Sequence, residues 1–182
     1  MYGPGTTSRK DDMEREAIIF IGMQASGKST FYQQRFGDSH VRINLDMLGT
    51  RQREQQFVAA CLTTFAGFVV DNTNPTRKER ERYIGPARAR GFRVIAYYFD
   101  CSLDECLQRN RTRERKVPEK VIGEFYKRTE PPVTGEGYDE IHIVTHGQPS
   151  IHTARIFNTF VVRQRFPSLT QEISFKAAHP TE

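Results

Sequence analysis

The sequence of 182 residues predicts an α/β fold, in which a doubly wound parallel sheet carries helices on both faces. Short apolar runs, typical of strands buried on both faces of a sheet, alternate with segments whose apolar residues have helical spacing. The first run, residues 17–22, ends in glycine and leads through a turn into a helix. Ligands of such sheets bind at the carboxyl ends of the strands.

The other elements follow in order along the chain. Further strands are expected over residues 40–44, 67–71, 92–99 and 139–145. Helices are expected over residues 28–35, 50–65, 76–90, 102–110, 119–128 and 151–162.

Local signals support several of these helices. Thr76 with Glu79, and Ser102 with Glu105, have the spacing of capping boxes at helix starts. Pro118 suits a first helical position, whereas the Gly-Pro pair at 85–86 is expected to kink or break its helix.

The length suits one compact domain. Residues 1–16 are polar and are expected to form a flexible leader before a nucleotide-binding domain over residues 17–145. Residues 146–182 fit the strand–helix alternation least well. They are expected to form a C-terminal helix and tail, which could lead into a second, covalently linked domain.

Charge is distributed unevenly. Lys and Arg number 27 against 22 Asp and Glu, and residues 77–128 alone hold fifteen basic and eight acidic residues. This stretch favours either a polyanionic partner or solvated helix faces rich in arginine. The three cysteines lack metal-site spacing and no apolar stretch is long enough to cross a membrane, so a cytoplasmic protein is expected, or a nuclear one in a eukaryote.

The turn after the first strand carries a phosphate-binding motif. Residues 22–29, GMQASGKS, match GxxxxGK[ST] between a predicted strand and a predicted helix. Lys28 is expected to reach the β- and γ-phosphates of ATP or another nucleoside triphosphate, and the Ser29 hydroxyl to bind Mg²⁺. The residues expected to contact the nucleotide here are Gly22, Ala25, Ser26, Gly27, Lys28, Ser29 and Thr30.

The remaining motifs favour a small phosphotransferase. The guanine-reading NKxD of a GTPase is absent, and an AAA-type ATPase is usually longer, with a different acidic strand end. A kinase needs a carboxylate to accept the acceptor's hydroxyl proton. Asp46, after the second strand, is the first candidate for this base, with a helix cap as its structural alternative. Asp71, at the end of the third strand, is the second; it could instead belong to a turn or support Mg²⁺ and Ser29.

Arginines predict a basic helical lid. Arg109, Arg111, Arg113 and Arg115 alternate with polar residues. On a helix, Arg109 and Arg113 would share one face and Arg111 and Arg115 another. A lid of this kind would bring one pair onto the moving phosphoryl group, although a solvated basic face would give the same pattern.

Several blocks resemble the kinase domain of the polynucleotide 5′-kinase family, which includes the kinase half of polynucleotide kinase-phosphatases. The similarity runs from about residue 17 to residue 144. Its blocks are IGMQASGKSTF (21–31), INLDMLGTRQ (43–52), VVDNTNPTRKERERYI (69–84), LQRNRTRERKVP (107–118) and EPPVTGEGYDEI (130–141).

The resemblance implies that Asp46 is the general base for a 5′-hydroxyl and that Arg109 and Arg113 are lid arginines on the donor phosphates. Asp71 falls on an acidic position at a strand end. Some members carry an arginine three residues after the base to hold the acceptor phosphate, where this sequence has Gly49. Arg51 is the substitute expected first, and Arg53 is the alternative.

The sequence therefore predicts a Mg²⁺-dependent kinase that moves the γ-phosphate of ATP or another nucleoside triphosphate to the 5′-hydroxyl of DNA or RNA, in the repair of nucleic-acid ends. Two alternatives remain at this level. One is a small-molecule kinase acting on a sugar or an antibiotic, and the other is a nucleotide-dependent binding module without activity.

Overall fold

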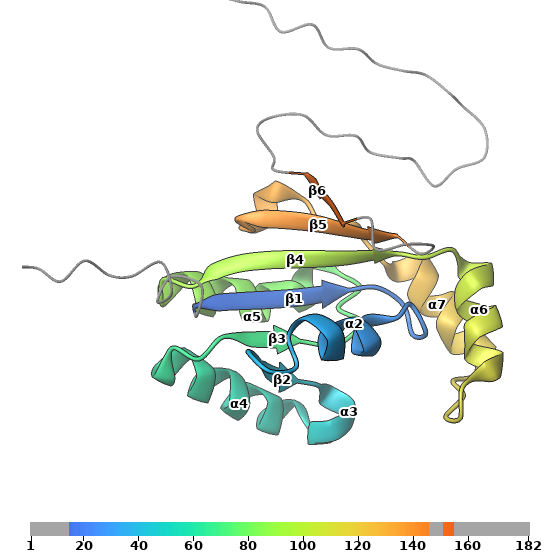
Figure 1. Cartoon of the computed structure of the whole chain (residues 1–182), viewed down its shortest axis with the longest axis horizontal. Coiled ribbons are helices and arrows are strands. Elements are labelled where there is room, and N and C mark those ends of the chain that lie inside the picture. The colour runs from blue at the N-terminus through green and yellow to red at the C-terminus, as the bar shows by residue number, and fades with distance from the viewer. Residues whose placement is uncertain (1–14, 146–150, 155–182) are drawn as a thin grey trace, which may run out of the picture.

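One six-stranded sheet forms the centre of the protein (Figure 1). The computed structural model describes residues 15–145 and 151–154. The strand order is β2-β3-β1-β4-β5-β6. The first five strands are parallel, and β6 runs antiparallel beside β5. The strands are β1 (Glu16–Ile21), β2 (Val41–Ile43), β3 (Phe68–Val70), β4 (Arg93–Asp100), β5 (Glu140–Thr145) and β6 (Ile151–Ala154). The predicted doubly wound sheet is confirmed over its five parallel strands.

Helices connect the strands. They are α2 (Lys28–Arg35), α3 (Leu45–Leu48), α4 (Arg51–Thr64), α5 (Arg77–Ala89), α6 (Leu103–Thr112) and α7 (Glu119–Arg128), with a 3₁₀ turn, η1, at Thr134–Glu136. All five helices expected before residue 130 are present, and the short α3 is an addition. Among the helices of the described residues, none combines the length and the apolar composition that crossing a membrane requires.

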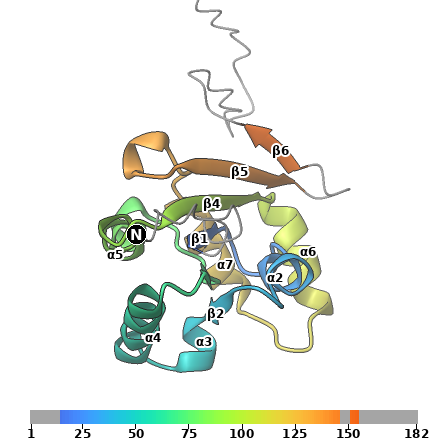
Figure 2. The same cartoon turned by 60° about the vertical axis from the view of Figure 1, so that its left-hand side comes forward.

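The two faces of the sheet bury different helices. The side chains of β1 alternate, with Ile18 and Phe20 packed on the α2 side, and Ala17, Ile19 and Ile21 packed on the side of α4 and α5. Figure 2 shows α2 lying across the sheet from α4 and α5. Because β1 is buried on both faces, its sequence is apolar at every position from Ala17 onward.

Two expectations are wrong: a break of the helix at residues 85–86 and a helix that includes residues 151–154. The Gly-Pro pair at 85–86 does not break α5, which continues through Pro86 to Ala89. The buried residues Tyr83, Ile84 and Ala87 pack on the sheet on both sides of Pro86, so this packing outweighs the one backbone hydrogen bond that proline removes.

Residues 151–154 form the edge strand β6 in place of the start of the predicted helix. So short a run fits the apolar spacing of a helix or of a strand. The open edge of β5 supplies backbone hydrogen-bond partners, which favour the strand. The rest of that predicted helix and tail, like the leader over residues 1–14, lies outside the described residues.

Candidate active site

The phosphate loop lies at the carboxyl end of β1, where the chain connections turn to opposite sides of the sheet. Its backbone has positive φ angles at Gly22 (154°), Ala25 (62°) and Gly27 (97°). A Cβ on Gly22 would lie 2.9 Å from the Cβ of Phe99 and 3.2 Å from Ser26 Oγ. Glycine is therefore required at the first position of the motif for both conformation and space.

Lys28 is curled back over this loop. Its buried ammonium donates hydrogen bonds to the carbonyl oxygens of Gly22 (2.9 Å) and Met23 (2.5 Å), and to Ser26 Oγ (3.3 Å). Burial lowers the pKa of Lys28 to about 8, with Arg113 adding to this effect and Asp71 opposing it. The ammonium thus lacks a strong anionic partner, which the phosphates of a nucleotide would supply.

The start of α2 fits a nucleotide's phosphates. Gly27 is the N-cap and offers no side-chain acceptor to the first-turn N–H groups, and no acidic residue occurs in that turn. Unpaired N–H groups and the helix dipole favour an anion at this end. The exposed side chains of Ser29 and Thr30 stand at the same turn. The predicted nucleotide contacts from Gly22 to Thr30 lie on this loop and turn, whereas the other two, Arg109 and Arg113, lie on and after α6.

Ser29 and Asp71 meet at the neighbouring corner of the site. Ser29 Oγ donates to Asp71 Oδ2 at 3.0 Å, and Asp71 is 2% exposed at the end of β3. A hydroxyl and a carboxylate are the hard oxygen ligands that Mg²⁺ prefers, held directly or through water. The pair fits the predicted magnesium position, with Asp71 placed to support Ser29.

Arg42, which belongs to no sequence motif, occupies the same corner. Its Nε donates to Asp71 Oδ2 at 2.9 Å, its Nη2 also contacts that oxygen, and Nη2 donates to Ser29 Oγ at 2.9 Å. The guanidinium also stacks over the ring of Tyr32, 5.3 Å from its centroid. The only hint in the sequence was a long basic side chain on a strand that pairs with the strand of Asp71.

Two asparagines attach α3 to the end of β3. Asn44 caps α3 by accepting from the Met47 amide, and its Nδ2 donates to the Asp71 carbonyl at 2.6 Å. Asn72 Oδ1 accepts from the Leu45 amide at 2.8 Å. These bonds hold the helix of Asp46 beside the corner formed by Asp71 and Ser29.

The carboxylate of Asp46 is exposed. Asp46 lies in the first turn of α3, and no other described residue hydrogen-bonds or pairs with its carboxylate. The alternative of a helix cap is wrong, because Asn44 performs that function. The structure thus brings Asp46, Asp71, Ser29 and Lys28 to one edge of the sheet.

Arg51 and Arg53, the two candidate substitutes for the arginine missing at Gly49, differ in their bonding partners. Arg51 Nη1 is bound to Glu54 Oε2 (2.7 Å) and to the Tyr83 hydroxyl (3.0 Å). Arg53 pairs with no carboxylate of the described residues, and its Nη1 lies 3.9 Å from where a Cβ on Gly49 would stand. The guanidinium of Arg53 therefore lies close to the space that a side chain at residue 49 would occupy, whereas Arg51 is held in its ion pair with Glu54.

The lid is a helix followed by a loop. α6 ends at Thr112, and Arg113 is its extended C-cap. The prediction of shared helix faces is therefore wrong both for Arg109 with Arg113 and for Arg111 with Arg115. Asn110 pins the loop by bonding both the carbonyl (2.7 Å) and the amide (2.9 Å) of Val117.

A small apolar cluster packs the base of the lid against the phosphate loop; its buried members are Met23, Cys101, Cys106 and Ile122. Within it Arg109 Nη1 lies 3.7 Å from Cys101 Sγ. Arg113 is close enough to lower the pKa of Lys28. Both predicted lid arginines therefore lie near the phosphate loop, although Arg113 lies beyond the helix.

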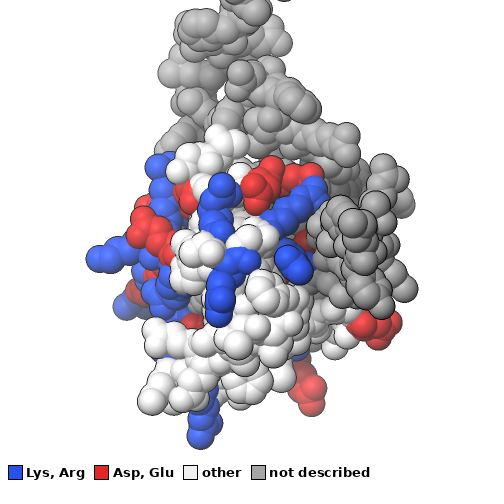
Figure 3. All heavy atoms as spheres, turned by 90° about the vertical axis from the view of Figure 1, so that its left-hand side faces the viewer, with Lys and Arg blue, Asp and Glu red and all other residues white. Residues whose placement is uncertain are grey.

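Six of the fifteen basic residues of the stretch are neutralised by ion pairs. The arginines of residues 77–128 that pair with carboxylates are Arg77, Arg80, Arg88, Arg93, Arg111 and Arg128. On the face where the strands begin, basic and acidic side chains lie side by side (Figure 3). Nine basic residues of the stretch have no ion pair among the described residues. Four of them lie on the lid, Arg109, Arg113, Arg115 and Lys116, and the others are Lys78, Arg82, Arg90, Lys120 and Lys127.

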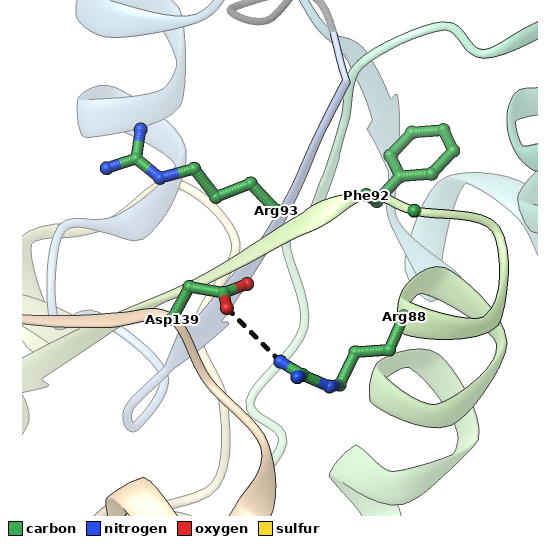
Figure 4. Close-up of a pocket in the computed structure, with 5 residues that line it drawn as sticks. Arg88, Phe92, Arg93 and Asp139 are labelled. Carbon is green, nitrogen blue, oxygen red and sulfur yellow. Dashed lines mark hydrogen bonds and ion pairs between the residues drawn. The ribbon is translucent and has the colours of Figure 1, made fainter.

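A cavity of about 420 Å³ lies away from this site. Its lining residues are Arg88, Gly91, Phe92, Arg93 and Asp139, which belong to the starting edge of the strands (Figure 4). Arg88 pairs with Asp139 at 3.2 Å, and Arg93 pairs with Glu16 at 3.1 Å. With its charges already paired, the cavity has no part in the chemistry at the phosphate loop.

Residues 18–132 match the protein family described as "AAA domain". The match covers more than half of the chain and includes the phosphate loop, both acidic candidates and the lid. The chain belongs to this family. The family description does not by itself specify a motor, and the curated relatives that the chain matches include kinases.

A bifunctional polynucleotide phosphatase/kinase of Schizosaccharomyces pombe is 25% identical over 141 residues, which cover 74% of this chain and 35% of that protein. An L-seryl-tRNA(Sec) kinase of Methanococcus maripaludis is 25% identical over 161 residues, covering 78% of this chain and 63% of that one. The chain thus spans about a third of the length of the first relative and just under two thirds of the length of the second.

A gluconokinase from Sinorhizobium meliloti has the same fold. Its solved structure aligns with a TM-score of 0.53 and 18% identity, covering 75% of this chain and 85% of that one.

Proposed function

We propose that this AAA-domain protein is an ATP- and Mg²⁺-dependent polynucleotide 5′-hydroxyl kinase. The observation that carries the proposal is the open acceptor side of the site. Asp46 stands exposed and unpaired on α3, beside Met47, which is 67% exposed, and on the same side as the unpaired Arg53. An exposed base flanked by a cation suits the end of a long chain better than a small molecule that must be enclosed.

Each group has a defined part in the proposed transfer. Asp46 accepts the proton of the 5′-hydroxyl as the hydroxyl oxygen attacks the γ-phosphorus, and the bond from the γ-phosphorus to the β-phosphate oxygen breaks to release ADP. Lys28 and the N–H groups of α2 hold the β- and γ-phosphates, and Ser29 with Asp71 holds Mg²⁺. Arg109 and Arg113 approach from the lid and stabilise the charge of the moving phosphoryl group.

The acceptor's backbone phosphate is assigned to Arg53. The guanidinium of Arg53 donates weakly to the Leu48 carbonyl at 3.4 Å and has no acidic partner among the described residues. Arg51, the first choice from the sequence, would have to leave its bond to the buried Glu54. Because a phosphate contact reads no base, we expect little dependence on the sequence of the acceptor strand.

The test is transfer of labelled γ-phosphate from ATP to 5′-hydroxyl oligonucleotides, with DNA and RNA, single- and double-stranded, compared side by side. Asp46→Asn should lower transfer by at least about 100-fold with ADP affinity unchanged. Asp38→Asn, an exposed acid after α2, is the matched control. Full activity of Asp46→Asn would overturn the assignment of the base.

The same assay separates the alternatives. Efficient transfer to mononucleosides or sugars, with oligonucleotides inert, would make the protein a small-molecule kinase. Tight ATP binding without transfer to any acceptor would make it a binding module.

A further inference from the structure

Arg42 occupies the place that a metal ion would need. Its guanidinium spans Ser29 Oγ and Asp71 Oδ2, the two oxygens that fit Mg²⁺. The Asp71 carboxylate is buried, and its Oδ2 already accepts from Ser29 and from two nitrogens of Arg42. A cation of the protein itself therefore neutralises this corner of the site.

Arg42 and a divalent cation would compete for this corner. Both carry positive charge, and both use the lone pairs of the same oxygens. At separations of a few ångströms in a partly buried site, like charges repel substantially. The contacts of Arg42 and a filled metal position would thus exclude each other at this corner.

The side chain of Arg42 also has room to move away from this corner. Its side chain is 23% exposed, and its Nη1 already faces Met47 Sδ on α3, at 3.7 Å. Met47 is itself 67% exposed, so the guanidinium can swing outward without opening the core. Its stem remains on β2, and the outward direction leads toward the helix that carries Asp46.

We propose that Arg42 is a positioning residue that competes with Mg²⁺. In the protein without nucleotide it holds Asp71 and Ser29 together, and it leaves this corner when a magnesium nucleotide binds. The proposal rests on the proposed use of Mg²⁺ with the nucleotide, but it needs no particular acceptor.

The competition predicts the effect of removing the guanidinium. ADP affinity is measured by calorimetry twice, in EDTA and in excess Mg²⁺, and the ratio of the two is the metal's contribution. In Arg42→Gln this ratio should rise about tenfold over wild type, the equivalent of one lost charge-assisted hydrogen bond. Arg35→Gln, which removes an exposed arginine of α2 without an ion pair among the described residues, should leave it unchanged.

Other roles of Arg42 give other results. If Arg42 binds the phosphates directly, Arg42→Gln weakens ADP equally with and without Mg²⁺, and the unchanged ratio overturns the proposal. If Arg42 is needed to orient Asp71 for the metal, the ratio falls, which also overturns it. ADP binding does not involve the acceptor, so failure of the polynucleotide proposal would appear separately, in the transfer assay.

A lysine variant covers the case in which Arg42→Gln does not fold. Arg42→Lys keeps a positive charge for Asp71, but a single ammonium is compact and lacks the planar fork of the guanidinium. The ratio in Arg42→Lys should rise two- to threefold, and a ratio equal to wild type would overturn the proposal.

Discussion

Protonation of Lys28 should control nucleotide binding near pH 8. In the protein without nucleotide, burial lowers the pKa of this ammonium from 10.5 to about 8. At pH 7 about nine-tenths of the molecules carry the charge, and at pH 9.5 only about one in thirty does. If the charged form alone binds the phosphates, ADP affinity should fall about thirtyfold between these two pH values.

The direction follows from the two ionisation states. Phosphates stabilise the ammonium, so the pKa of Lys28 rises when ADP binds, and binding takes up a proton above pH 8. Affinity is therefore fully present below pH 8 and is lost as the pH rises through that value. A lysine with its ordinary pKa of 10.5 would remain nine-tenths charged at about pH 9.5, and affinity would scarcely change.

The assay is calorimetric titration of ADP in EDTA from pH 7 to pH 9.5, with the fold checked by circular dichroism at each pH. Cys106 needs a control, because its hydrogen bond with Cys101 lowers the pKa of its thiol, and a thiolate there would also repel phosphate. Cys106→Ser should reproduce the wild-type profile. An affinity that stays constant up to pH 9.5 would refute the link between burial of Lys28 and phosphate binding.

Three further predictions concern stability. Gly22→Ala should lower the free energy of unfolding by at least about 2 kcal/mol in urea, because its methyl group would meet the Phe99 Cβ at 2.9 Å; a stable variant would show that the loop adapts. Arg80→Met should cost about 3 kcal/mol in the same assay, because the Glu136 side chain, which is 5% exposed, loses its two-point pair and its remaining ion pair is the longer contact with Arg77 at 3.8 Å; a loss below about 1 kcal/mol would contradict this. Asn110→Ala should reduce protection of the Val117 amide from hydrogen exchange, and unchanged protection would mean that another contact holds the lid loop.

The sheet and the phosphate loop were predictable because they depend on local patterns. Apolar runs specify strands that are buried on both faces, and the loop is specified by a motif that Gly22 and Gly27 satisfy through their own backbone angles. The capping box of Ser102 and Glu105 was predictable for the same reason and is formed in full. The spacing of apolar residues predicted a helix over residues 151–154, but pairing with the open edge of β5 makes them a strand.

The sequence by itself determined the fold class, the phosphate loop and the acidic residues that follow the second and third strands. Only the tertiary structure decided which charged residues are available for chemistry. Arg51 and most arginines of α5 are paired with carboxylates that lie far from them in the chain or are buried, whereas Asp46 and Arg53 have no such partner among the described residues. Arg42 likewise became a member of the site only because β2 lies beside β3, which brings its guanidinium onto Asp71. Charge along a sequence can be counted, but its effect depends on which opposite charge lies within a few ångströms, and that is set by packing.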